Sequence, residues 1–404
     1  MTAITSASTD DRSNWLGIGY GLMVGALAGY HQFKVPPVLP ILLRSYGIDE
    51  TFGASYMSIY AVVGLLLSGA IGAWQRDRGI APYLFAGFGF LAAGNALGLA
   101  APNIPALFLA SRGCEAIGFS ILAINCPLLC ARHASASHRM IAVAIGATWI
   151  PVGQLFANLL GIVVLADENW QALWWGGLGA SLAFAALTWA LMRAGLVDLS
   201  APRAPGGAGA AAADRHLMRT VWLVAVLFCL WSIQMIAYLT WLPEVLVSVF
   251  ALTPDRAALA YTIPVVTVLV FNLVGGALLR RGVPVAPLLA ASLALQLAVW
   301  LALPYTGSDW TGIASLVVFG IGAGVSPTCL FAMPSLLFGA NPPSGAFAAL
   351  MTGRNLGVLA GPLLLSAAFA LTGDWNVASP MFAVSTGLAV AGAIALHRLM
   401  RRPA

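Results

Sequence analysis

Long apolar stretches alternate with short polar segments along the whole chain. Each stretch exceeds the ~18 to 20 residues that a helix needs to cross the ~30 Å hydrocarbon core of a bilayer. None shows the alternation of lipid-facing and lumen-facing residues expected of a membrane-spanning β-barrel strand. The pattern therefore predicts an all-α integral membrane protein with twelve transmembrane helices, at residues 15–41, 51–74, 82–101, 104–131, 140–165, 172–192, 220–248, 257–279, 285–304, 311–337, 345–371 and 377–397.

The composition agrees with a membrane protein. Of the 404 residues, 60% are hydrophobic and 8% are charged, whereas soluble domains carry about 25% charged residues. The net charge of +5 comes from arginines at predicted helix ends, so it does not indicate a nucleic-acid partner. We expect no metal and no cofactor, because the cysteines all fall inside predicted spans, where small packing residues are common; they are Cys114, Cys126, Cys130, Cys229 and Cys329.

The distribution of arginines predicts the orientation in the membrane. With the N-terminus inside, the cytoplasmic segments hold most of the arginines, and the outer loops hold Arg44 and Arg256. By the positive-inside rule, both termini are predicted to be cytoplasmic. The polar start of the chain lacks the basic region and cleavage site of a signal peptide. We expect an integral protein of a bacterial inner membrane.

The chain divides into two halves around a segment rich in Gly, Pro and Ala, whose composition suits a flexible connector. Leu39-Pro40 recurs as Leu242-Pro243, 203 positions later, and the stretch from Gly72 to Gly79 has a counterpart at the same offset. Duplicated six-helix units around a central site are a transporter architecture. The predicted parts are a tail at 1–14, a six-helix bundle at 15–192, a linker at 193–219, a second bundle at 220–397 and a tail at 398–404.

The stretch "GAWQRDRG" resembles the loop signature of the major facilitator superfamily, G-x-L-a-D-R-x-G-R-R. Both glycines match, but the acid and the base stand transposed, as Arg76 and then Asp77. In that family the acid contacts a neighbouring helix and holds one gated state, so the transposition puts this contact in doubt. The second copy, "GGALLRRG", has no acid. The resemblance implies the family's fold and a gating role for Gly72, Arg76, Asp77, Gly79, Gly275, Arg280, Arg281 and Gly282.

Further stretches carry the resemblance. "SRGCEAIG" is similar to the family's fourth-helix signature R-x-x-Q-G-x-G, with Glu115 in the Gln position, and its arginine implies proton coupling or anion contact. The antiporter signature G-x-x-x-G-P is poorly met, because Ile150 replaces its second glycine; this weakens an exporter interpretation. "AYLTWLPEVL", "PPVLPILLRSYGI" and "NWQALWW" resemble the cyanate-permease-like group, whose members take up small anions.

Ionisable side chains at bilayer depth cost about 2.5–3.5 kcal/mol each and therefore suggest function. Lys34, the one lysine of the chain, lies roughly 28 Å along the first predicted helix. His31 precedes it by three residues and shares its face. Lys34 either snorkels to the outer headgroups or faces a cavity, where a compact ammonium suits a binding or proton-linked site.

Three further charges lie within predicted spans. Arg112 and Glu115 are three residues apart; they form an internal ion pair, or Glu115 exchanges a proton and releases Arg112 when substrate arrives. Arg354 has no acid within one helical turn, so it binds an anionic substrate or pairs with an acid on another helix. Glu244, near the outer end of the seventh span, is a candidate gate residue.

Cations outnumber acids among these groups, which favours an anionic substrate. Gln234 lies 203 positions after His31 and is expected at an equivalent depth in the second half. Tyr238 and Trp241 are candidates for an aromatic wall. The predicted substrate-binding residues are thus Lys34, His31, Arg112, Arg354, Gln234, Tyr238 and Trp241.

The sequence indicates a secondary active transporter that moves a small anion by alternating access. The chain contains no Walker A phosphate loop, so an ion gradient is expected to drive it. We expect proton-coupled uptake, with Glu115 or His31 titrating. The alternatives are a proton-coupled exporter of a drug or metabolite and, more remotely, a receptor or scaffold without transport. We expect no enzymatic activity, and a monomer whose partners are the solute, the proton and the bilayer.

Overall fold

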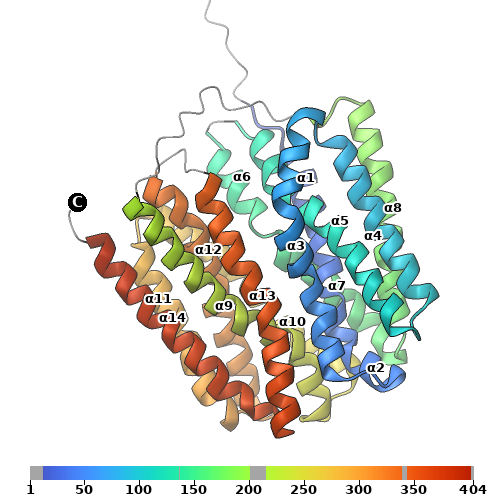
Figure 1. Ribbon diagram of the computed structural model, residues 1–404, viewed down its shortest axis with the longest axis vertical. Coiled ribbons are helices and arrows are strands. Elements are labelled where there is room, and N and C mark those ends of the chain that lie inside the picture. Colours follow the sequence, from blue (N-terminus) through green and yellow to red (C-terminus); the bar gives the residue numbers. More distant parts are fainter. Residues whose placement is uncertain (1–11, 136, 201–214, 339–343, 402–404) are drawn as a thin grey trace, which may run out of the picture.

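The computed structural model describes residues 12–135, 137–200, 215–338 and 344–401, without the side chains of 68–78, 139, 140, 143, 215, 216, 344, 345, 347 and 401. The described residues form helices and connecting turns (Figure 1). The helices are α1 (Trp15–Phe33), α2 (Val35–Tyr46), α3 (Glu50–Arg78), α4 (Ala81–Ala100), α5 (Pro105–Arg132), α6 (Arg139–Gly146), α7 (Trp149–Val164), η1 (Leu165–Asp167), α8 (Gln171–Arg193), α9 (Arg215–Ser248), α10 (Pro254–Arg280), α11 (Val285–Ala302), η2 (Leu303–Tyr305), α12 (Trp310–Phe338), α13 (Ser344–Thr372), η3 (Trp375–Val377) and α14 (Ala378–Arg401).

The prediction of an all-α membrane protein is confirmed. Within the described residues, eleven helices are long and apolar enough to cross a membrane. The predicted span that does not qualify is the first one. Its helix α1 carries the polar residues His31 and Gln32 in its last turn. The described chain starts and ends on one side of the bundle, which we call the termini face, and α2 ends at the opposite side, the far face (Figure 1).

The first span is not the single helix predicted for residues 15–41. It divides into α1 and α2, with Lys34 between them. Pro36 and Pro37 have no N–H to donate to the carbonyls of Gln32 and Phe33, four residues earlier, and this loss breaks the helix. The predicted fifth span, 140–165, likewise divides into α6 and α7.

In each half, the helix of the first span packs closely against that of the fifth span. In the C-terminal half, α9–α14, a Cβ on Gly353, Gly357 or Gly361 of α13 would meet the backbone of α9. In the N-terminal half, α1–α8, a Cβ on Gly153 of α7 would meet the carbonyl of Ala26 in α1. Small residues at four-residue spacing let membrane helices approach closely. The same packing of a first against a fifth span in both halves agrees with a duplicated unit.

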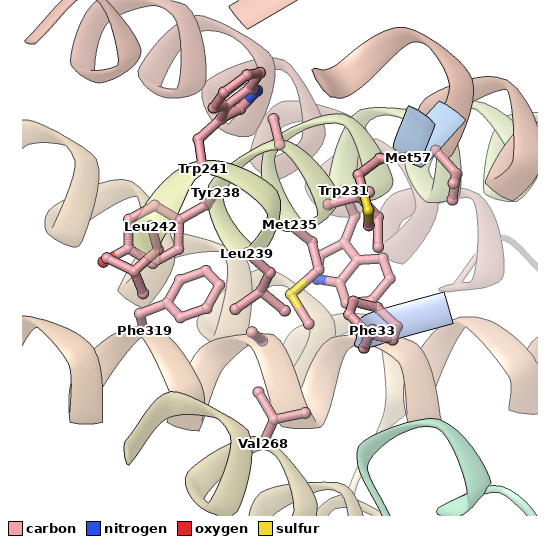
Figure 2. Packing of buried hydrophobic residues seen from close by; sticks show 14 of the residues in the cluster. Phe33, Met57, Trp231, Met235, Tyr238, Leu239, Trp241, Leu242, Val268 and Phe319 are labelled. Carbon is pink, nitrogen blue, oxygen red and sulfur yellow. The ribbon is translucent and has the colours of Figure 1, made fainter. Parts of the chain in front are cut away.

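The two halves contact one another through α3 with α13, α7 with α10, and α2 with α9 and α10. A buried apolar cluster fills the space between them. Phe33 of α1 and Met57 of α3 lie beside Trp231 and Met235 of α9, as Figure 2 shows. These side chains close the interface directly beside the break in the first span.

The described part of the predicted linker folds against the termini face. Val197 and Leu199 are buried, and the backbone N–H of Ile80 donates to the carbonyl of Leu199 at 3.0 Å. The Asp198 N–H donates to His133 Nε2 at 2.9 Å. The Ser200 side chain and N–H beside the Asp198 carboxylate lower its pKa. The remaining linker, 201–214, lies outside the described residues, as do the tail residues 1–11.

Candidate functional site

A cluster of buried polar side chains lies inside the N-terminal half, at the break in the first span. We call Lys34, Arg112, Glu115, His31 and Asn95 the charge cluster; each has 0% of its surface exposed. They come from the α1–α2 junction, from α4 and from α5. The cluster therefore joins three helices that are distant in sequence.

Lys34 points into the protein and does not snorkel. Its Nζ donates to Glu115 Oε1 at 2.7 Å and to Asn95 Oδ1 at 2.5 Å. The ammonium also lies 4.3 Å from the centre of the Trp174 ring, within the range of a cation–π interaction. The interpretation that Lys34 reaches the outer headgroups is thus wrong.

Arg112 holds the end of α1. Its guanidinium donates to the carbonyls of His31 at 2.8 Å and of Gln32 at 3.3 Å. The Gln32 carbonyl has no partner within the helix because Pro36 carries no N–H. A cation at a helix C-terminus is also favoured by the helix dipole. Pro36 thus leaves one of the two carbonyls that Arg112 binds, that of Gln32, without a backbone donor.

Glu115 is the carboxylate that, among the described side chains, pairs with both cations. Its Oε2 accepts from Arg112 at 2.5 Å and from the Tyr60 hydroxyl at 3.0 Å, while Oε1 accepts from Lys34. The Tyr60 ring lies 4.2 Å from the Arg112 guanidinium carbon. Gly94 of α4 makes room, because a Cβ there would touch Glu115. The predicted Arg112–Glu115 pair exists, and Lys34 extends it.

The contacts of His31 suit a neutral imidazole. Asn95 Nδ2 lies 3.3 Å from His31 Nδ1, and Ser181 Oγ lies 3.1 Å from His31 Nε2. Because the Ser181 hydroxyl donates to the Gly177 carbonyl at 2.7 Å, it accepts from Nε2–H, and Nδ1 accepts from Asn95. This tautomer follows from the hydrogen-bond network. With His31 neutral, the charge cluster holds two cations and one anion.

Arg354 lies in the other half, on α13, and is partly buried. Its Nη1 donates to Asn355 Oδ1 at 3.1 Å. Asn355 faces α3, where a Cβ on Gly64 would lie 3.3 Å from its Nδ2. Among the side chains that the structure describes, no acid forms an ion pair with Arg354. The arginine thus stands at the contact between the halves, without a carboxylate partner among the described side chains.

The C-terminal half holds a neutral counterpart of the charge cluster. Gln234 Nε2 donates to Gln296 Oε1 at 2.6 Å, and Gln296 Nε2 donates to Ser326 Oγ at 3.0 Å. Gln234 contacts α11 as His31 contacts α4, and Gln296 follows Asn95 by 201 positions. Sequence reasoning missed Asn95 and Gln296, although each interrupts an apolar span near the same place in its half.

Tyr238 and Trp241 belong to a different site from the charge cluster. They line a cavity of about 270 Å³ at the far-face end of the C-terminal half, together with Trp375 and Phe382. The Tyr238 ring packs on Phe319 with centroids 4.6 Å apart, and Trp241 Nε1 donates to the Pro362 carbonyl at 3.3 Å. The structure thus does not bring the predicted aromatic wall to Lys34.

The predicted gating residues are distributed over both faces. Gly79 and Gly282 follow the ends of α3 and α10 and adopt φ of 79° and 82°. Because glycine readily adopts such positive φ angles, it is favoured at both of these equivalent positions. Arg280 and Arg281 are exposed at the end of α10, and Gly275 packs against α12 with a built Cβ 3.4 Å from Thr328 Cβ. Glu244 is partly buried near the end of α9. The side chains at Gly72, Arg76 and Asp77 lie outside the described part of the structure.

Comparison with known proteins agrees with this architecture. The family model described as Major Facilitator Superfamily matches residues 21–362, which is most of the chain. A search of curated proteins finds no significant match. The matched region contains the charge cluster, the interface between the halves and Arg354.

Proposed function

The chain belongs to the Major Facilitator Superfamily, and we propose that this membrane transporter carries a small anion by proton-coupled uptake. As a member of that family it is a transporter and not an enzyme. The anion, the proton and the direction are our proposal. One observation carries it: among the described side chains, Lys34 and Arg112 share one carboxylate, that of Glu115, and no acid pairs with Arg354.

The excess of buried positive charge favours an anion. Charges removed from water cost several kcal/mol each unless they are paired. A small anion between the halves would supply the counter-charge that the described side chains do not offer Arg354, through the planar donor fork that suits carboxylate-like groups. Because the charge cluster is fully buried, we expect the anion to contact Arg354 first. The charge cluster would then act on the bound anion through its electrostatic potential, without direct contact.

Glu115 is the proposed proton carrier. While ionised, it neutralises one of its two cations; once protonated, it leaves Lys34 and Arg112 without a counter-charge. An anion bound nearby would compensate for that loss. Protonation and anion binding would therefore favour one another, which is the energetic requirement for symport.

A binding experiment tests the anion. Purified protein in detergent is heated with formate, acetate, cyanate or nitrate, and with the uncharged analogues acetamide and urea. We expect an anion at ten times its Kd to stabilise the protein by about 1.4 kcal/mol. Arg354→Ala should lose this effect, whereas Arg44→Ala, which removes an exposed pair with Glu168, should retain it. If the anions stabilise Arg354→Ala as well as the parent, the anion site is wrong.

Liposomes distinguish the direction and the coupling. An imposed pH gradient should accumulate the stabilising anion on the alkaline side, and Glu115→Gln should abolish the response to the gradient. Efflux against the proton movement would favour the exporter alternative. Binding without counterflow would favour a receptor without transport.

A further inference from the structure

We infer that Tyr261 is a positioning residue that links the proline-containing helix α9 to closure of the far face. The Tyr261 hydroxyl donates to the Leu239 carbonyl of α9 at 2.8 Å. The same oxygen accepts from Gln154 Nε2 of α7, also at 2.8 Å. Tyr261 is 0% exposed and Gln154 2%. One buried phenol oxygen thus connects both halves of the transporter.

The acceptor on α9 is available because of a proline. Pro243 stands four residues after Leu239, where a helix would normally supply an N–H to the Leu239 carbonyl. A buried carbonyl without a donor is costly, and the Tyr261 hydroxyl supplies the missing hydrogen bond. The bond to Leu239 therefore holds Tyr261 in place within the C-terminal half, whether or not Gln154 contacts it.

The contact with Gln154 lies on the far side of the bundle. Gln154 is ten residues before the end of α7 and Tyr261 seven after the start of α10, which is about 15 Å and 10 Å from the far-face helix ends. Nearby, a Cβ on Gly161 of α7 would lie 4.0 Å from Ala258 Cβ of α10. The α7–α10 contact thus closes the far face beside this hydrogen bond.

Opening of the far face must separate α7 from α10 and break this bond. Tyr261 would keep its bond to Leu239, but the Gln154 amide would lose its acceptor. The Gln154–Tyr261 bond therefore favours the far-closed state over the far-open state. This inference concerns the transport cycle itself and does not depend on the identity of the solute.

A cysteine reporter tests the inference. Ala258 is 1% exposed and faces Gly161, so Ala258→Cys should react with a maleimide when the far face opens. Reactivity is measured in detergent, with the protein lacking the reporter as the background for native cysteines. We expect Gln154→Leu to raise the labelling rate about fivefold, the effect of losing one buried hydrogen bond. Tyr261→Phe should raise it by at least as much.

The control is Tyr20→Phe, which removes a buried hydroxyl contact with Thr188 at 2.7 Å inside the N-terminal half. It should lower thermal stability without changing the labelling of the reporter. The double variant Gln154→Leu/Tyr261→Phe should label no faster than Tyr261→Phe alone, because both changes remove the same bond. Unchanged or slower labelling in Gln154→Leu would overturn the inference, even if Tyr261→Phe did not fold. Equal acceleration by Tyr20→Phe would overturn it as well.

Discussion

Glu115 makes three buried side chains depend on one another. It accepts from Lys34 at 2.7 Å and from Arg112 at 2.5 Å, and all three side chains are fully buried. Removal of Lys34 leaves a neutral Arg112–Glu115 pair. Removal of the carboxylate instead leaves two cations without a counter-charge, which is the more costly state in a low-dielectric interior.

We therefore predict that Glu115→Gln destabilises the protein more than Lys34→Met. Breaking a buried pair by removal of one partner costs about 3–5 kcal/mol, and Glu115→Gln breaks two pairs at once. The double variant Lys34→Met/Glu115→Gln should regain part of the loss, because it buries one uncompensated cation instead of two. Unfolding of the purified variants in detergent, followed by tryptophan fluorescence, measures the order. Equal destabilisation by the two single variants would contradict it.

Part of the charge cluster could be predicted from the sequence. The spacing of Arg112 and Glu115 on one helix predicted their pairing, and the scarcity of lysine drew attention to Lys34. Pairing of Lys34 with Glu115 could not be predicted, because it depends on the rotation and depth of α1 relative to α5. The same reason explains why Asn95 was missed.

Two prolines each free a backbone carbonyl that a side chain of another helix then binds. Pro36 leaves the Gln32 carbonyl for Arg112, and Pro243 leaves the Leu239 carbonyl for Tyr261. In each case a side chain from another helix replaces the missing backbone donor. Proline in membrane helices is tolerated when neighbouring groups satisfy the backbone in this way. The Arg112–Gln32 and Tyr261–Leu239 hydrogen bonds thus have the same kind of cause, a carbonyl that a proline leaves without a backbone donor.

We predict that the effect of Tyr261→Phe depends on Pro243. In the parent, Tyr261→Phe leaves the Leu239 carbonyl buried without a donor, at a cost of about 1–3 kcal/mol. In a Pro243→Ala background, the substituted alanine supplies a backbone N–H to that carbonyl, so the same change should cost less. Thermal unfolding of the two single variants and the double variant measures the coupling. If the costs are additive, Tyr261 does not replace the proline's missing hydrogen bond.

In the described part of the chain, eleven of the twelve predicted spans correspond to apolar stretches long enough to cross a membrane, because apolar length reports membrane crossing directly. The division of the first span was not predicted, although the residues responsible, Pro36 and Pro37, are visible in it. Proline inside a membrane helix does not always break it: α9, α10 and α13 each continue through one. Its effect depends on the groups that surround the freed carbonyl.

At the scale of the molecule, the two halves meet where α7 contacts α10 and α3 contacts α13. The Ser58 hydroxyl donates to the Leu359 carbonyl across the second of these contacts at 2.9 Å. The repeat in the sequence predicted two halves but not which face they close, because that choice depends on small differences between whole-body arrangements. Alternating access requires these contacts to open in another state.

A covalent link across the α7–α10 contact should therefore stop transport. A Cβ on Gly161 would lie 4.0 Å from Ala258 Cβ, within the ~3.5–4.5 Å range of disulfides. We predict that oxidised Gly161→Cys/Ala258→Cys, reconstituted in liposomes, transports the stabilising anion at least tenfold more slowly than the reduced form, and that a reductant restores the rate. The single variants should respond to neither oxidant nor reductant.

Anion binding to the same cross-linked protein shows whether transport stops because the far face is held closed or because the binding site is lost. If the link holds the halves closed at the far face, the anion should still stabilise the oxidised protein from the termini face, because Arg354 lies on α13 and not on either linked helix. Loss of both binding and transport would mean that the link distorts the site. Full transport by protein shown to be cross-linked would mean that α7 and α10 stay together throughout the cycle, and that the far face opens along a different contact.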